Sequence, residues 1–200
     1  TMCREGFWAS MITEFSRGSG STVLDVRDDL VKAKRDGPVY YKTDHHWNEA
    51  AGRLCADAIM LKVCEGREGM GVARSYRRQD VMTWGMGLAQ TINRAEDYRD
   101  LRIVLTATDD IARPQPSRID MWTLSPNKAH MTQIGVRTST NPALEPTVVC
   151  FGDSFVDNVA MFLADQCGQL VMVKSFANRE MIQRVITDCE PDAIVEVVSQ

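Results

Sequence analysis

The chain has 200 residues, of which 44% are hydrophobic and 25% are charged, and its formal net charge is −4. This length allows a substantial core, and the composition is that of an ordinary globular protein. The acidic balance argues against a general nucleic-acid-binding surface, and no stretch approaches the roughly 18 apolar residues that span a bilayer. The sequence therefore predicts one domain over residues 1–200.

The first part of the chain alternates short apolar runs with turns. We expect the end of a helix over 7–17, a strand over 22–26, a helical turn or two over 28–35 and a strand over 39–43. Apolar positions at helical spacing predict a longer helix over 48–63, with Asn48 as its N-cap. Because the chain starts inside what reads as a helix, we expect a fragment that is truncated at the N-terminus.

Residues 65–146 are the least regular part of the sequence. Five glycines between 66 and 87 interrupt the front of this region, and five prolines between 114 and 146 interrupt its back. A helix around 87–95 and a strand around 101–106 are predicted within it. We interpret the rest as an irregular insertion of loops and short strands that can lie over a functional site.

From residue 147 the pattern alternates strands with helices. The predicted order is strand 147–151, helix 155–167, strand 170–174, helix 178–189 and strand 193–198. Such a βαβαβ run implies a parallel sheet with right-handed crossovers. The predicted fold class is therefore α/β, a parallel sheet sandwiched by helices, whose ligands bind beyond the carboxyl ends of the strands.

A Gly152-Asp153-Ser154-Phe155 turn follows the first strand of this run. It holds the Ser154 hydroxyl at the sheet edge, where backbone N–H groups of the next helix can stabilise an oxyanion. Asp153 is interpreted as part of the turn. Serine is also a favoured helix N-cap, so the turn alone does not distinguish a nucleophile from a cap.

An Asp44-His45-His46-Trp47 segment supplies the complement of this serine. In an extended backbone, residues two apart share a face, so Asp44 can orient His46 while His45 points the other way. The pattern predicts Ser154 as nucleophile, His46 as general base and Asp44 as its orienting acid. A helix start with a capping aspartate and a surface histidine is the alternative. Trp47 can wall the site or stack on a sugar ring, or it can be a core tryptophan.

Asn178 and Arg179 open the helix after the second strand, at the same sheet edge as Ser154. They can bind an anionic substrate group, help to stabilise the oxyanion, or simply cap the helix. No metal and no other cofactor is predicted, because the adjacent histidines lack the i, i+4 spacing of a helical metal pair. None of the six cysteines forms a Cys-x-x-Cys pair, and most lie among apolar neighbours, as buried free thiols do.

Taken together, these motifs resemble those of a known family. The run Val39–Gly52 resembles the Asp-x-His-Trp motif of the alginate O-acetyltransferases and the related DHHW proteins, which are SGNH-hydrolase-like enzymes. Gly85–Ala89 resembles a mid-chain Gly-x-Leu-Ala element of that group, 148–155 its nucleophile block and 191–198 its last core strand. The resemblance spans roughly residues 22–198 and implies a flavodoxin-like fold of the SGNH-hydrolase type. As in the alginate O-acetyltransferase branch, acid and base precede the nucleophile.

By this resemblance, Asp44 orients, His46 is the base and Ser154 carries an acetyl group to hydroxyls of an alginate-like exopolysaccharide. The resemblance also implies a periplasmic or cell-envelope location, with the signal or anchor outside this fragment. Its acetyl donor is then a membrane-bound O-acyltransferase partner.

The chain departs from the family pattern at both ends, since it lacks the family's first core strand and the Glu-Arg that often ends the last strand. Two other interpretations stay open. One is a carbohydrate esterase that uses the same three residues, and the other is an inactive polysaccharide-binding module.

Overall fold

The computed structural model of the chain describes residues 21–67, 74–109, 118–124, 132–142, 144–175 and 177–198. Over 118–124 and 132–139 it describes the backbone alone. The helix predicted over 7–17 lies outside these residues. Of the helices in the described part of the chain, none combines the length and the apolar character that a membrane span requires.

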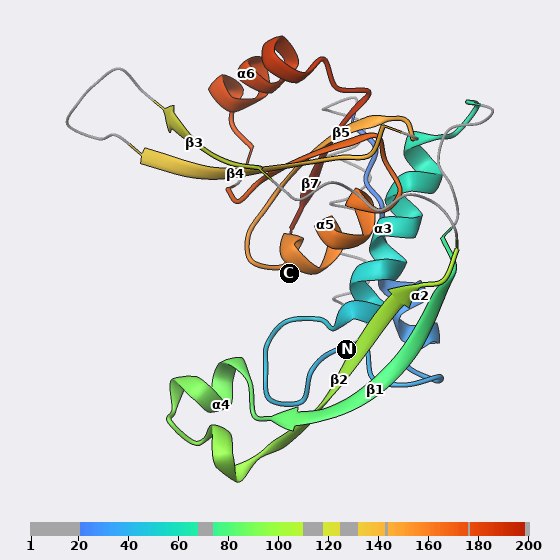
Figure 1. Cartoon of the computed structure of the whole chain (residues 1–200), viewed down its shortest axis with the longest axis vertical. Helices are drawn as coiled ribbons and strands as arrows, with labels where there is room; N and C mark the ends of the chain where they lie inside the picture. Colours follow the sequence, from blue (N-terminus) through green and yellow to red (C-terminus); the bar gives the residue numbers. More distant parts are fainter. Residues whose placement is uncertain are drawn as a thin grey trace, which may run out of the picture.

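A five-stranded sheet in the order β3-β4-β6-β5-β7 forms the central layer (Figure 1). β5 (Thr147–Gly152) lies between β6 (Gln169–Val173) and β7 (Ala193–Val197) and is parallel to both. β4 (Thr132–Thr140) continues the sheet antiparallel to β6, and β3 (Arg118–Leu124) pairs antiparallel with β4. The predicted parallel βαβαβ run is confirmed. β3 and β4 come from the region that was interpreted as an insertion of loops and short strands, and the structure places both strands in the main sheet.

Three helices cover the two faces of this sheet. α3 (Glu49–Val63) and α5 (Val156–Ala164) lie on one face and α6 (Arg179–Cys189) on the other (Figure 1). α3 and α5 approach closely at Gly52, where a Cβ atom would lie 2.4 Å from the backbone oxygen of Asn158. The layers are therefore helix, sheet and helix, in agreement with the predicted fold class.

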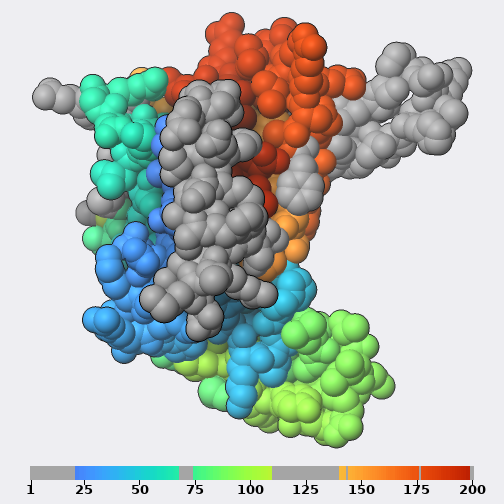
Figure 2. Space-filling model, turned by 180° about the vertical axis from the view of Figure 1, so that it is seen from behind, coloured from blue at the N-terminus to red at the C-terminus, as the bar shows by residue number. Residues whose placement is uncertain are grey.

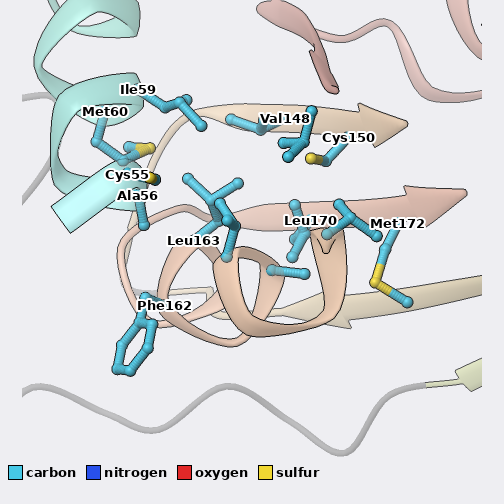
Figure 3. Packing of buried hydrophobic residues seen from close by; sticks show 14 of the residues in the cluster. Cys55, Ala56, Ile59, Met60, Val148, Cys150, Phe162, Leu163, Leu170 and Met172 are labelled. Carbon is cyan, nitrogen blue, oxygen red and sulfur yellow. The ribbon is translucent and has the colours of Figure 1, made fainter. Parts of the chain in front are cut away.

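The alternation of side chains along β5 divides the core between these faces. Val148 and Cys150 belong to the cluster with α3 and α5, whereas Val149 and Phe151 pack against α6. All four side chains are completely buried, and burying an apolar side chain of this size contributes about 1.5–3 kcal/mol. Figure 3 shows side chains of α3 and α5 directed toward β5 and β6. A strand buried on both faces reads in sequence as one apolar run, and 147–151 does.

A second, two-stranded antiparallel sheet lies beside the main domain. It consists of β1 (Tyr76–Trp84) and β2 (Arg99–Ala107). Its far end carries α4 (Gly87–Thr91) and the short 3-10 helix η1 (Ala95–Asp97). The predicted strand around 101–106 is confirmed as part of β2, whereas β1 was not predicted. In Figure 2 the green tip of this sheet lies against the light-blue segment near residue 40.

The segment before α3 folds into a loop. α2 (Arg27–Ala33) and the Asn48 cap of α3 agree with the predictions, since the Asn48 side chain accepts hydrogen bonds from two N–H groups of the first turn. The strands predicted over 22–26 and 39–43 are wrong. Residues 39–48 bond across their own bend, with Asn48 N donating to Val39 O at 3.0 Å, and therefore add no strand to the sheet.

Candidate active site

Three side chains from two distant segments meet just beyond the end of β5. His46 Nε2 lies 2.7 Å from Ser154 Oγ, and His46 Nδ1 lies 2.7 Å from Asp44 Oδ1. The same carboxylate oxygen accepts the backbone N–H of His46 at 3.1 Å. The structure thus brings together the three residues that the sequence singles out as nucleophile, base and acid.

The Ser154 turn is shaped by its neighbour Asp153. Asp153 Oδ1 accepts the N–H of Phe155 at 2.9 Å, and its backbone carbonyl accepts the N–H of Val156 at 3.2 Å. The N-cap residue of α5 is Phe155, which makes no side-chain cap bond. Ser154 is therefore no helix cap in this structure, and its hydroxyl contacts His46 instead.

The other segment, residues 42–46, is a bend and not the extended strand that was expected. As a result, the prediction that His45 points away is wrong, because side chains alternate only along extended backbone. His45 Nδ1 lies 3.3 Å from Asp44 Oδ1, and its ring centroid lies 3.9 Å from that of His46. The two rings differ in exposure, at 55% for His45 and 22% for His46. His46, not His45, contacts Ser154.

The Asp44 carboxyl group is only 13% exposed. Burial alone would raise its pKa, but the hydrogen bonds from the His46 ring and backbone N–H lower the pKa of Asp44 below its ordinary value. Asp44 is therefore ionised at neutral pH and can stabilise a positive charge on His46. Gly87 of α4 packs directly against this carboxylate, since a Cβ atom there would lie 2.4 Å from Asp44 Cγ.

Asp100 of β2 is a buried carboxylate that the sequence interpretation missed. It is 3% exposed and accepts the backbone N–H groups of Lys42 at 3.1 Å, Thr43 at 2.6 Å and Leu101 at 2.8 Å, as well as the Thr43 hydroxyl at 2.5 Å. Burial by itself would raise the pKa of Asp100, but these hydrogen bonds lower it below its ordinary value. The contact with Thr43 spans 57 residues, so no local pattern could have indicated it.

Thr43 also forms hydrogen bonds with the start of α4. Its hydroxyl accepts the N–H of Met86 at 2.9 Å, and its carbonyl accepts the N–H of Leu88 at 3.0 Å. The loop that carries Asp44 is thus held by β2 on one side and by α4 on the other. In this way β2 and α4, which belong to the region expected as an irregular insertion, support Asp44, the acid of the site.

Of the two roles predicted for Trp47, the structure shows that of a core tryptophan. Its side chain lies in the core and is 8% exposed, which leaves little of the ring for contact with a sugar. Its Nε1 donates to the carbonyl of Phe155 at 3.0 Å, and its own carbonyl accepts Asn158 Nδ2 at 2.7 Å. These two bonds join the segments that carry His46 and Ser154. The role of Asn158, a residue within α5, was also missed.

Asn178 and Arg179 are both exposed at the start of α6. The Asn178 side chain accepts the N–H of Met181 at 3.0 Å, so it caps the helix. The loop before them lies beside the Ser154 turn, because Gly152 N donates to Ser175 O at 3.0 Å. Among the contacts described, none joins either side chain to the three residues of the site.

The sheet, its covering helices and the serine at the end of β5 define an SGNH hydrolase-like α/β domain. The model of one family matches residues 10–183, and its description reads "SGNH hydrolase-like domain, acetyltransferase AlgX". The chain belongs to this family, as the resemblance predicted. No curated protein was found that matches the chain.

Solved structures of similar fold agree with this assignment. PatB1 of Bacillus cereus is 15% identical with a TM-score of 0.57, over 89% of this chain and 68% of that one. A DHHW family protein of Eubacterium siraeum is 13% identical with a TM-score of 0.56, over 85% and 62%. The O-acetyltransferase domain of Pseudomonas putida AlgJ is 12% identical with a TM-score of 0.50, over 95% and 63%. The chain therefore spans less than two thirds of the DHHW protein and of the AlgJ domain, and at these identities the likeness concerns the fold.

Proposed function

We propose that the chain is a serine-dependent O-acetyltransferase that moves an acetyl group to hydroxyls of an exopolysaccharide. The observation that carries this proposal is the continuous contact from Asp44 through His46 to Ser154, with both distances at 2.7 Å. Membership of a family described as acetyltransferases supports the choice of acetyl as the transferred group. An inactive binding module would be expected to hold Ser154 out of reach of His46, and the observed distance argues against it.

The first half of the reaction loads the serine. His46 Nε2 takes the hydroxyl proton while Ser154 Oγ attacks the acetyl carbonyl of the donor. The tetrahedral intermediate collapses, the bond to the donor oxygen breaks, and that oxygen leaves with the proton that His46 held. Ionised Asp44 stabilises the imidazolium during this step and keeps the His46 proton on Nδ1.

The second half unloads the serine. A sugar hydroxyl gives its proton to His46 and attacks the acetyl-serine carbonyl, and Ser154 Oγ leaves with that proton. The products are an acetylated sugar and free enzyme. Water in place of the sugar gives acetate, so transfer requires that the site positions the acceptor and excludes water.

The acceptor, the donor and the location extend this proposal. An alginate-like acceptor is anionic, and the exposed guanidinium of Arg179, with Asn178 beside it, lies at the sheet edge where such a group can bind. A membrane-bound O-acyltransferase is proposed as the acetyl donor, and the periplasm as the place of the reaction. These points rest on the family resemblance.

The test is a time course with a chromogenic acetyl ester, with and without an added oligosaccharide. Wild-type protein is expected to form an acetylated serine and then an acetylated sugar. Ser154→Ala is expected to do neither, because it lacks the nucleophile. Ser75→Ala, an exposed serine beside β1, is the matched control and is expected to retain full activity.

Three outcomes distinguish the interpretations. Acetylated oligosaccharide supports the transferase. Free acetate as the sole product, still dependent on Ser154, indicates the esterase. Equal rates for Ser154→Ala and wild type would contradict both enzymatic interpretations.

A further inference from the structure

Three adjacent residues direct metal-ligating atoms toward one another. Asp44 Oδ1, His45 Nδ1 and His46 Nδ1 all lie within 4.8 Å of one another. The spacing of the two histidines argues against a metal pair only on a helix, where the side chains of adjacent residues point in different directions. Residues 42–46 form a bend instead, and there both imidazole rings reach the same carboxylate oxygen.

One of the two distances to Asp44 Oδ1 already matches what a tetrahedral cation needs. Zinc binds imidazole nitrogen at about 2.0–2.1 Å and carboxylate oxygen at about 2.0–2.2 Å, so its ligand atoms lie about 3.3 Å apart. His45 Nδ1 already lies 3.3 Å from Asp44 Oδ1, whereas the 2.7 Å between His46 Nδ1 and this oxygen must open by about 0.6 Å. A small side-chain rotation of His46 or Asp44 is enough for this one change.

We propose that a divalent cation of the zinc type binds reversibly to Asp44, His45 and His46. One carboxylate and two imidazoles are a donor set that suits zinc, and three protein ligands leave a position for water. His45, at 55% exposed, provides the way in from solvent. The site does not require any residue beyond the loop that carries the acid and the base.

Binding at this place would stop acetyl transfer. A neutral imidazole carries one proton, and a cation on His46 Nδ1 leaves that proton on Nε2. Nε2 is the atom that lies 2.7 Å from Ser154 Oγ, so it could no longer accept the serine proton. The cation also takes the Asp44 carboxylate that orients His46. The cation therefore inhibits the enzyme, because the loop cannot bind it and keep the contacts from Asp44 through His46 to Ser154 at the same time.

The inhibition rests on the proposed function, but the binding does not, so the two are measured separately. Zinc chloride is titrated by calorimetry without substrate, and in parallel into the acetyl-ester assay, each rate being expressed relative to the same protein without zinc. One cation per chain is expected to bind and inhibit, and a chelator is expected to restore the rate.

His45→Phe is the informative variant. Phenylalanine keeps a ring against His46 and Phe155, where His45 now packs, but has no nitrogen donor. The zinc concentration for half inhibition is expected to rise by about tenfold or more, since even partners outside the ligand shell change metal affinity by 10–100-fold. The calorimetric affinity is expected to fall by the same factor.

Two results separate failure of the metal site from failure of the proposed function. Equal zinc affinity and inhibition in His45→Phe and wild type would overturn the metal site, and would assign the cation to other donors such as the thiols of Cys64 and Cys189, which are not fully buried. Binding that His45→Phe weakens, in a protein without any acetyl transfer, would support the metal site and contradict the proposed function.

Discussion

Gly87 offers a sharp test of the geometry around the acid. Its φ angle of +34° lies in the left-handed region, and a Cβ atom would lie 2.4 Å from Cγ and Oδ2 of Asp44 and 2.6 Å from Oδ1. Ordinary van der Waals contacts begin near 3.4 Å, so Gly87→Ala must displace the carboxylate by about 1 Å. A carboxylate that swings aside by this distance leaves His46, to which it bonds at 2.7 Å.

The loss is therefore expected in catalysis more than in stability. A misplacement of about 1 Å in a catalytic group can cost about 10²-fold in rate, which is the decrease in kcat that we expect for Gly87→Ala. The left-handed backbone conformation adds about 1–2 kcal/mol of destabilisation for any residue with a Cβ atom. Most of the protein would still be folded at such a cost.

Gly66→Ala is the matched control for the backbone contribution. Gly66 also has a positive φ angle, +75°, but a Cβ atom there would meet nothing within 4 Å. Both variants are expected to lose similar unfolding free energy in urea, while only Gly87→Ala loses kcat in the acetyl-ester assay. Equal kcat values for the two alanine variants would refute the role of the Gly87 contact in placing Asp44.

Two further predictions concern stability. Asp100→Asn is expected to lower the unfolding free energy at pH 7 by about 2 kcal/mol in urea titrations, because a buried acceptor of four hydrogen bonds is altered. The pKa of Asp100 is lowered in the folded protein, so the stability that this carboxylate contributes is fully present above its ordinary pKa of 3.8 and is lost as the pH falls through the folded pKa. If the stability difference between Asp100→Asn and wild type persisted below the folded pKa, this reasoning would be contradicted. Gly52→Ala is expected to cost about 1–3 kcal/mol by forcing α3 from Asn158, and an unchanged melting temperature would exclude that close approach.

The C-terminal part of the fold was predictable because its signals are local. The run over 147–151 is apolar on both faces of β5, and the helices that follow show helical periodicity, so strand order and parallel pairing follow from connection rules. The Asn48 cap is likewise a local signal and was predicted correctly. The antiparallel strands β3 and β4 and the first strand of the hairpin were not recognised, because glycines and prolines nearby obscured their alternation.

The residues that make up the site could be predicted from residue types and their order along the chain. A serine after a buried strand, with an aspartate and a histidine two residues apart upstream, was enough to choose Asp44, His46 and Ser154. Their spatial arrangement could not be predicted, because it depends on packing between segments 108 residues apart. The bend at 42–46, which brings His45 to the same carboxylate, is held by Asp100 and by α4. Such long-range hydrogen bonds leave no periodicity in the chain, so folding alone establishes where these side chains point.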